Sequence, residues 1–256
     1  MIVASALDEL RIWRHGSDGD VGFVPTMGAL HKGHVSLVQQ SRATCDSTAV
    51  SIYINPTQFD NADDLASYPE TLQKDLDTLE GLGVDCVFVP TYEVLYPDDF
   101  AYQVEERGFS NTLCGAHRPS HFTGVLTVVM KLLNLVRPDK AFFGEKDFQQ
   151  LTLIRNMVDA FFMDVEIVGC PTVREPDGLA MSSRNLNLAP ADRQQAPIFR
   201  EILEKATSDD DARRQLGEAG FVVDYVETIE GRRLGAVSVG AADRSVRLID
   251  NITLEL

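Results

Sequence analysis

The sequence is poor in positive charge. Lysine and arginine together number 23 against 39 aspartates and glutamates, for a formal net charge of −16 over 256 residues. Because phosphate neutralisation supplies most non-specific affinity for nucleic acids, such a chain is a poor candidate for binding DNA or RNA. The acidity does not exclude a nucleotide, since a few local cations and backbone N–H groups can hold one. Nucleotide binding therefore depends on the positions of the lysines and arginines rather than on their number.

Long apolar runs are also missing. No uncharged stretch approaches the ~20 residues that a membrane helix needs, so no membrane partner is expected. The first residues, MIVASALDELRIWRHG, contain no basic segment followed by an apolar one, so a secretory signal is not expected and a cytoplasmic location is predicted.

No His, Cys and carboxylate cluster has the spacing of a fixed metal site, so no protein metal site is predicted. The four cysteines are far apart and are expected to be small buried residues, with Cys114 the most open to another role. They are Cys45, Cys86, Cys114 and Cys170.

Short β-like runs alternate with helical patterns along the first two thirds of the chain. The predicted strands are 21–24, 48–54, 84–89, 140–143 and 165–170. Apolar residues at helical spacing predict helices within 70–82, over 124–136 and over 151–162. This alternation favours a Rossmann-like, mainly parallel α/β sheet with helices on both faces, whose ligands gather beyond the carboxyl ends of the strands.

The pattern changes after about residue 176. A polar helix over 191–206 and the charged run SDDDARRQ lead into strand-like segments at 221–230, 235–240 and 244–252. We therefore predict a first domain over 1–175 and a small α+β C-terminal domain over 176–256, joined through the segment REPDG.

The stretch VGFVPTMGALHKGH, residues 21–34, places two histidines three residues apart after a glycine-containing loop. If 21–24 is a strand, HKGH opens the next helix, where N–H groups and the helix dipole favour an anion. His31 and His34 can then face one ligand and donate hydrogen bonds to it. Their protonation stays open, because the dipole lowers their proton affinity. The alternative is that one histidine caps the helix and the other lies in the core.

PTMGALHKGH resembles the HxGH signature of the nucleotidylyltransferase superfamily and, in this form, that of the pantothenate synthetase (pantoate–β-alanine ligase) family. The likeness continues through NPTQF (55–59), residues 118–157, residues 168–185 and RLIDNI (247–252), so it spans nearly the whole chain. HxGH alone would indicate only the superfamily. The resemblance implies an enzyme of the coenzyme A pathway that uses ATP, with Mg²⁺ carried by its phosphates, and assembles as a homodimer.

Two further motifs can hold phosphates. In GEKDFQQL, Lys146 can reach a phosphate as a point charge and Asp147 can accept from ribose hydroxyls, unless the two form a solvated pair at a helix start. In MSSRN, hydroxyls and the forked Arg184 suit a polyphosphate, unless Arg184 is a surface charge beside a turn. This second loop resembles the KMSKS element of HxGH enzymes.

The resemblance implies these roles residue by residue. The catalytic residues are His31, His34, Lys146 and Arg184, which neutralise charge on the triphosphate, with His34 as the family's proton donor. The ATP site comprises Met27, Gly28, Ala29, Leu30, His31, Lys32, Gly33, His34, Gly144, Glu145, Lys146, Asp147, Val173, Met181, Ser182, Ser183 and Arg184. Gln58 and Gln150 bind pantoate, Gln58 also lies near β-alanine, and Asn55 braces its loop. The small C-terminal domain closes as a lid over the intermediate.

Some positions depart from the family pattern. Lys32 stands where an acid is common, Ser120 replaces the glycine of RPGHF, and Glu70 stands where arginine is usual. The C-terminal domain also looks short for the family. His117 and His121, around RPSHF, are expected to be structural rather than ligands.

Rival functions stay open at this point. A nucleotidylyltransferase that keeps the nucleotide on its product shares HxGH, although NPTQF and the glutamine after GEKDF argue against it. A class I aminoacyl-tRNA synthetase is disfavoured by charge and length. An adenine-nucleotide sensor without catalysis is disfavoured by the presence of both histidines, Lys146 and Arg184.

Overall fold

The computed structural model describes residues 1–60, 65–66, 68–69, 71–241 and 244–254. The chain forms two compact units. The first comprises Met1–Glu145 and Gln149–Cys170, and the second comprises Lys146–Phe148 and Pro171–Leu256. Division into domains at 175/176 stays a prediction, and Glu70 lies outside the described residues.

The first unit contains a parallel six-stranded sheet in the order β1-β4-β3-β2-β5-β6. Its strands are β1 (Ile2–Ala4), β2 (Val21–Thr26), β3 (Ser47–Ile52), β4 (Cys86–Phe88), β5 (Lys140–Gly144) and β6 (Glu166–Cys170). The five predicted strands are confirmed. The prediction missed β1, a three-residue edge strand in which Ile2 and Val3 are exposed, so it lacks the long buried run of its neighbours.

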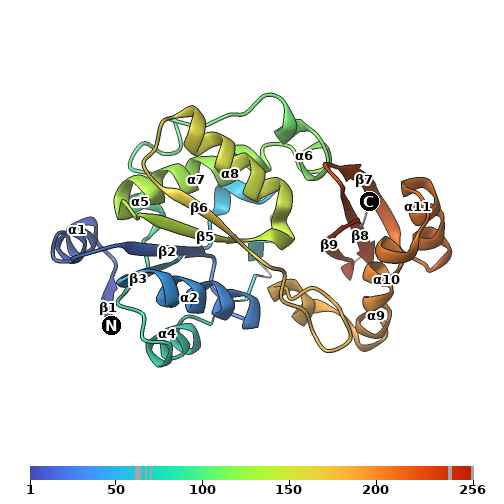
Figure 1. Cartoon of the computed structure of the whole chain (residues 1–256), viewed down its shortest axis with the longest axis horizontal. Coiled ribbons are helices and arrows are strands. Elements are labelled where there is room, and N and C mark those ends of the chain that lie inside the picture. The colour runs from blue at the N-terminus through green and yellow to red at the C-terminus, as the bar shows by residue number, and fades with distance from the viewer. Residues whose placement is uncertain (61–64, 67, 70, 242–243, 255–256) are drawn as a thin grey trace. The chain divides into compact units, whose positions relative to one another are not determined.

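Helices cover both faces of this sheet, with α2 and α4 on one side and α7 and α8 on the other (Figure 1). The bounds are α1 (Leu7–His15), α2 (Lys32–Thr44), α4 (Leu72–Gly81), α5 (Tyr92–Leu95), α6 (Cys114–His117), α7 (His121–Val136) and α8 (Phe148–Ala160). Short 3₁₀ turns are η1 (Pro56–Gln58), η2 (Phe109–Asn111) and η3 (Glu145–Asp147). The helix α7 is buried along most of its length because its apolar face is unusually wide.

The strand order reverses at β2. From β2 the chain adds β3 and β4 toward one edge of the sheet, and later adds β5 and β6 on the other side of β2. In open α/β sheets, ligands bind outside the carboxyl ends of the strands at such a reversal. The loop after Thr26, at the end of β2, therefore occupies the position where a ligand is expected.

The second unit has an antiparallel sheet in the order β7-β8-β9. Its elements are η4 (Ser183–Asn187), α9 (Pro190–Gln195), α10 (Pro197–Lys205), α11 (Asp209–Glu218), β7 (Val222–Ile229), β8 (Arg232–Val239) and β9 (Val246–Thr253). Apolar side chains from α10, α11 and the three strands form its core.

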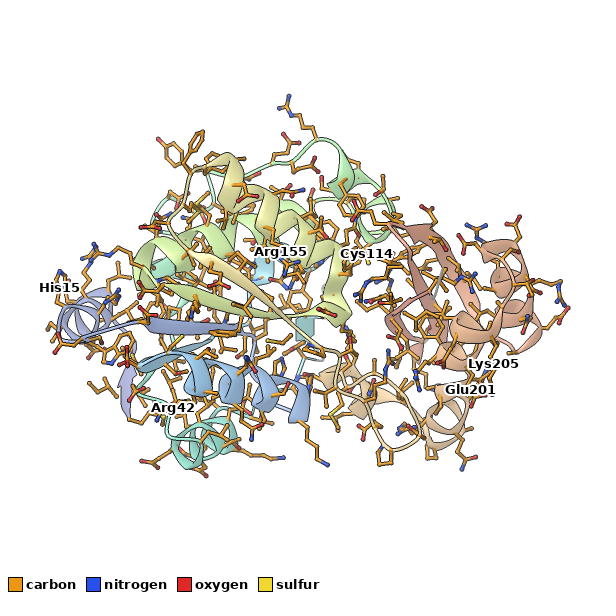
Figure 2. The ribbon with its side chains drawn as sticks, in the orientation of Figure 1. His15, Arg42, Cys114, Arg155, Glu201 and Lys205 are labelled. Carbon is orange, nitrogen blue, oxygen red and sulfur yellow. The ribbon has the colours of Figure 1, made fainter. Side chains whose placement is uncertain are left out.

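The predicted helix over 191–206 is two helices. Pro197 starts the second, because proline has no N–H to continue the first and suits the opening turn of a new helix. The charged run forms α11, capped by Ser208, whose hydroxyl accepts from the Asp211 amide at 3.1 Å. Glu201 and Lys205, labelled in Figure 2, form an exposed 3.2 Å ion pair along α10.

Among the described residues, no helix combines the length and apolar character needed to cross a membrane. Cys86, Cys114 and Cys170 are buried as predicted, whereas Cys45 is only half-buried. Burial raises the pKa of the Cys86 thiol to about 12, so it stays protonated at neutral pH.

Candidate active site

The two histidines of HKGH are held against each other at the start of α2. His31 is the N-cap, and its Nδ1 accepts a hydrogen bond from the Gly33 amide at 3.1 Å. The Nδ1 of His34 accepts in turn from the His31 amide at 3.4 Å. The two rings stack with centroids 4.1 Å apart. One histidine therefore does cap the helix, but both remain half-buried rather than part of the core.

These contacts favour one tautomer of each ring. A ring nitrogen that accepts from an amide carries a lone pair, so each neutral imidazole holds its proton on Nε2. Protonation of Nδ1 in His31 or His34 would remove the acceptor that the backbone amide needs. The pair thus presents two Nε2–H donor positions from a loop fixed by its own backbone.

The loop before the histidines directs its amides inward. Gly28 N donates to Thr26 Oγ1 at 3.2 Å, Ala29 N donates to Asp75 Oδ2 at 2.8 Å and Leu30 N donates to Asp75 Oδ1 at 2.9 Å. Gly28 has φ +82°, and a Cβ there would lie 3.2 Å from Asp75 Oδ2. The loop geometry therefore depends on glycine at this position.

Asp75 is the residue of this region that sequence reasoning missed. It is only 2% exposed, and besides the two amides it accepts from Thr71 Oγ1 at 3.0 Å. A signal was present, because Asp75 shares the inward face of α4 with Leu76 and Leu79. An acid on that face must find donors, and the sequence does not show that they come from residues 29 and 30.

Asn55 orients Gln58. It is almost fully buried, and its Nδ2 donates to Gln58 Oε1 at 3.1 Å and to the Gly124 carbonyl at 3.3 Å. Its Oδ1 accepts from the Tyr96 hydroxyl at 2.9 Å. Burial raises the pKa of Tyr96 to about 12, so that hydroxyl remains a donor at neutral pH. With its oxygen engaged by Asn55, Gln58 keeps its Nε2 as the donating end of the amide.

RPSHF supports the same loop from α7. His121 Nδ1 lies 2.8 Å from the Gln58 carbonyl oxygen, which fits the structural role expected of it. A Cβ on Gly124 would lie 2.3 Å from the Thr57 carbonyl oxygen, so α7 and η1 can touch only because this residue is glycine. Ser120 has φ +65°, a conformation that costs an L-residue roughly 1–2 kcal/mol and explains the glycine usual in the family.

The two adjacent glutamines of α8 differ. Gln149 is buried, accepts from the Cys114 amide at 3.0 Å and donates to the Phe109 and Thr112 carbonyls, both at 2.8 Å. It therefore fastens the segment around η2, a role that the sequence did not indicate. Gln150, the predicted pantoate residue, is half-buried.

Lys146 belongs to the second unit, although the predicted division placed it in the first domain. Its side chain is only 18% exposed and its Nζ lies 4.0 Å from Asp147 Oδ2. The Asp147 side chain is 44% exposed, so only the lysine of this pair is largely buried. The Lys146 carbonyl accepts from Asn251 Nδ2 at 2.9 Å.

The MSSRN loop follows a narrow turn. The Met181 amide donates to the Val173 carbonyl at 3.0 Å, so these two residues of the predicted ATP site lie side by side. Ser182 caps η4 by accepting from the Arg184 amide at 3.3 Å. Met181 and Ser183 are buried, and Arg184 is half-buried.

The predicted site residues thus fall into two groups. The first unit holds the histidine loop together with Asn55, Gln58 and Gln150, and the second holds Lys146, Asp147, Val173 and residues 181–184. Among the described residues, no cluster of three or more His, Cys, Asp or Glu side chains could hold a metal ion.

A parallel sheet whose strand order reverses at β2, followed there by a histidine-capped helix, defines the class: a Rossmann-like α/β protein of HxGH type. The family model for pantoate-beta-alanine ligases matches residues 2–253. The chain belongs to this family, and the resemblance inferred from the sequence is confirmed.

Individual relatives support this family assignment. The chain is 53% identical over 247 residues to a pantothenate synthetase of Bdellovibrio bacteriovorus, covering 96% of each protein. It is 48% identical over 237 residues to that of Legionella pneumophila (strain Lens), covering 93% of this chain and 92% of the other.

Solved structures match over nearly the whole chain. A pantoate-beta-alanine ligase from Francisella tularensis, complexed with beta-gamma ATP and beta-alanine, superposes with a TM-score of 0.93 at 39% identity, covering 99% of this chain and 97% of that one. The enzyme from Thermus thermophilus gives a TM-score of 0.88 at 40% identity, with 99% of each chain covered. Both matches thus extend over the two units of this chain.

Proposed function

We propose that this chain joins pantoate and β-alanine to form pantothenate, converting ATP to AMP and pyrophosphate. Family membership and the Francisella ligase complexed with beta-gamma ATP and beta-alanine support this function. The observation that carries the proposal is the stacked pair His31 and His34, held at the strand-order reversal with both Nδ1 atoms engaged by backbone amides.

The reaction runs in two steps. A carboxylate oxygen of pantoate attacks the α-phosphorus of ATP in line, the bond to the bridging oxygen breaks, and pyrophosphate leaves. The amine of β-alanine then attacks the carbonyl carbon of pantoyl adenylate, AMP leaves with the former bond electrons, and the amine loses a proton to solvent. No protein side chain is covalently modified, so positioning and charge stabilisation supply the catalysis.

The cationic and N–H groups act on the triphosphate. His31 and His34 donate from Nε2 to phosphate oxygens, and Lys146 and Arg184 neutralise the charge that develops as pyrophosphate departs. The tautomers argue for hydrogen-bond donation rather than proton transfer by His34, because a neutral ring that gave up its Nε2 proton would become an anion.

The remaining substrate groups have separate partners. Gln58 and Gln150 hold the hydroxyl and carboxylate groups of pantoate, Gln58 also lies near β-alanine, and Asn55 orients Gln58. Mg²⁺ arrives with ATP, held by phosphate oxygens and water. A closing second domain and a homodimer remain predictions from the resemblance, and a cytoplasmic location remains a prediction from the sequence pattern.

The decisive experiment incubates the protein with ATP, Mg²⁺, pantoate and β-alanine and omits each in turn. We expect pyrophosphate release without β-alanine in a single turnover, and AMP release only with it. Retention of the nucleotide on the product would indicate a simple nucleotidylyltransferase, and ATP binding without pyrophosphate release would indicate a sensor.

Lys146→Ala tests the charge-stabilising role directly. Loss of one such donor should weaken adenylate formation by ~2.7–4 kcal/mol, about 10²–10³-fold in isotope exchange between pyrophosphate and ATP. Lys205→Ala is the control, since Lys205 is exposed on α10. Near-normal exchange in Lys146→Ala would refute the assignment.

Gln58→Ala tests the pantoate site. Removing an amide that binds a charged substrate should raise the KM for pantoate roughly 10- to 100-fold and leave the KM for ATP nearly unchanged, as measured by initial rates. Gln73→Ala, an exposed glutamine of α4, serves as the control. The reverse pattern, with ATP affected more, would count against the glutamine interpretation.

A further inference from the structure

The family motif RLIDNI has no part in the mechanism above, yet it contains two of the most deeply buried polar side chains of the second unit. Asp250 and Asn251 are adjacent on β9 and each is 3% exposed. Buried polar side chains need partners, and consecutive strand residues point to opposite faces of a sheet. The two can therefore hold different segments of the chain.

Asp250 holds the turn that leads into MSSRN. Arg174 donates from its two terminal nitrogens to the two carboxylate oxygens of Asp250, at 2.6 and 3.0 Å. The same guanidinium donates to the Gly178 carbonyl at 3.1 Å, and Arg174 bridges Ala180 across the turn. The next residues along the chain are Met181 to Arg184. A bidentate, largely buried pair thus fixes the base of the loop that carries Arg184.

Asn251 holds the segment of Lys146. Its Nδ2 donates to the Lys146 carbonyl at 2.9 Å, and its Oδ1 accepts from Arg232 at 2.5 Å. The Arg232 guanidinium also lies 4.8 Å from the centre of the Phe148 ring. The Asn251 amide and the cation–π contact of Arg232 therefore both hold residues 146–148 within the second unit.

From these contacts we infer that Asp250 and Asn251 are positioning residues, which fix the Lys146 and Arg184 segments to one strand and so set the spacing of the two cations. The inference rests on the proposed function, in which both cations act on one triphosphate. Attachment to the same strand keeps the two cations at a constant spacing. This matters because a displacement of about 1 Å can lower a rate roughly 10²-fold.

Asn251→Asp is the sharpest test. The aspartate has the same size and keeps an oxygen that accepts from Arg232. Its second oxygen replaces the Nδ2 donor and repels the Lys146 carbonyl oxygen. We expect kcat for pyrophosphate–ATP exchange to fall roughly 10- to 100-fold, with the KM for pantoate nearly unchanged. Asn134→Asp is the matched control, because Asn134 makes the same kind of contact, to the Met130 carbonyl at 2.9 Å, on an exposed helix position.

A double-mutant cycle with Lys146→Ala separates positioning from general stability. If Asn251 acts through Lys146, Asn251→Asp should change exchange little further once Lys146 is alanine. Multiplicative losses, or wild-type exchange in Asn251→Asp, would overturn the inference. If Asn251→Asp does not fold, Asn251→Ala, which removes the donor without adding charge, is put through the same cycle. Normal exchange in Lys146→Ala alone would instead overturn the proposed role of the lysine.

Discussion

In the first unit, the residue that holds the histidine loop is a carboxylate, Asp75, which accepts from two backbone amides and a hydroxyl. In the second unit, guanidinium groups donate to backbone carbonyls instead. Arg174 binds Asp250 in the way described above, and Arg233 is 4% exposed while it donates to Asp209 and to the carbonyls of Leu203 and Ala206.

The difference follows from which backbone groups in each region need a hydrogen bond from a side chain. The loop before α2 has N–H groups that need acceptors, and a carboxylate supplies two oxygens for them. The end of α10 has carbonyls that need donors, and Arg233 reaches Leu203 and Ala206 with one nitrogen, 2.8 Å from each. A cation there also complements the negative end of the helix dipole. Both arrangements bury a charge, and each charge matches the polarity of the backbone around it.

Arg233→Met should have the largest effect on stability. It leaves the half-buried Asp209 and two carbonyls without their cationic donor, and each buried group left unsatisfied costs about 1–3 kcal/mol. Amide hydrogen exchange of peptides from β7 to β9 should report this loss, while peptides from β2 and β3 change less. Lys205→Met is the control, an exposed pair on α10 worth roughly 0.5 kcal/mol. Equal losses in both variants would show that Arg233 has no special role.

Asp75→Asn should have an intermediate effect. The amide keeps one acceptor but turns an NH₂ toward a loop amide that also donates, which costs about 1–3 kcal/mol. We expect faster hydrogen exchange in residues 27–34 and weaker adenylate formation. Asp77→Asn, an exposed acid of the same helix, should change neither. Unchanged exchange in residues 27–34 of Asp75→Asn would mean that the carboxylate does not hold the loop.

The smallest expected effect is a loss of stability of the second unit at acid pH. Burial alone would raise the pKa of Asp209, but hydrogen bonds from Thr228 and Arg233 outweigh it and lower the pKa below the ordinary value of 3.8. The charged form is thus favoured in the fold. This stability is fully present above the ordinary pKa and is lost as the pH falls below it toward the folded pKa.

Urea unfolding from about pH 6 to about pH 3 measures the effect, followed by probes in β7 and β8. The second unit should lose stability toward the acid end, and Asp209→Asn should make that dependence shallower. A pH dependence as steep in Asp209→Asn as in the parent chain would assign the acid sensitivity to other carboxylates.

Much of the fold followed from local patterns. The strand at 21–26 is buried on both faces, so its sequence is a continuous apolar run that needs no partner to be recognised. The helix α7 was equally clear from its apolar face. The break between α9 and α10 at Pro197 was not predicted, because the helical spacing of apolar residues continues through it, although proline itself was a visible signal.

The sequence by itself determined the family, the parallel sheet and the histidine pair, because strand and helix periodicity, glycine positions and the HxGH spacing act over a few residues. Only the tertiary structure decided what holds the site residues in place. Asp75 meets Ala29 and Leu30 across more than 40 residues, and Asn251 meets Lys146 across 105. Such contacts depend on which buried donors and acceptors the folded chain brings together, and no local pattern specifies that pairing.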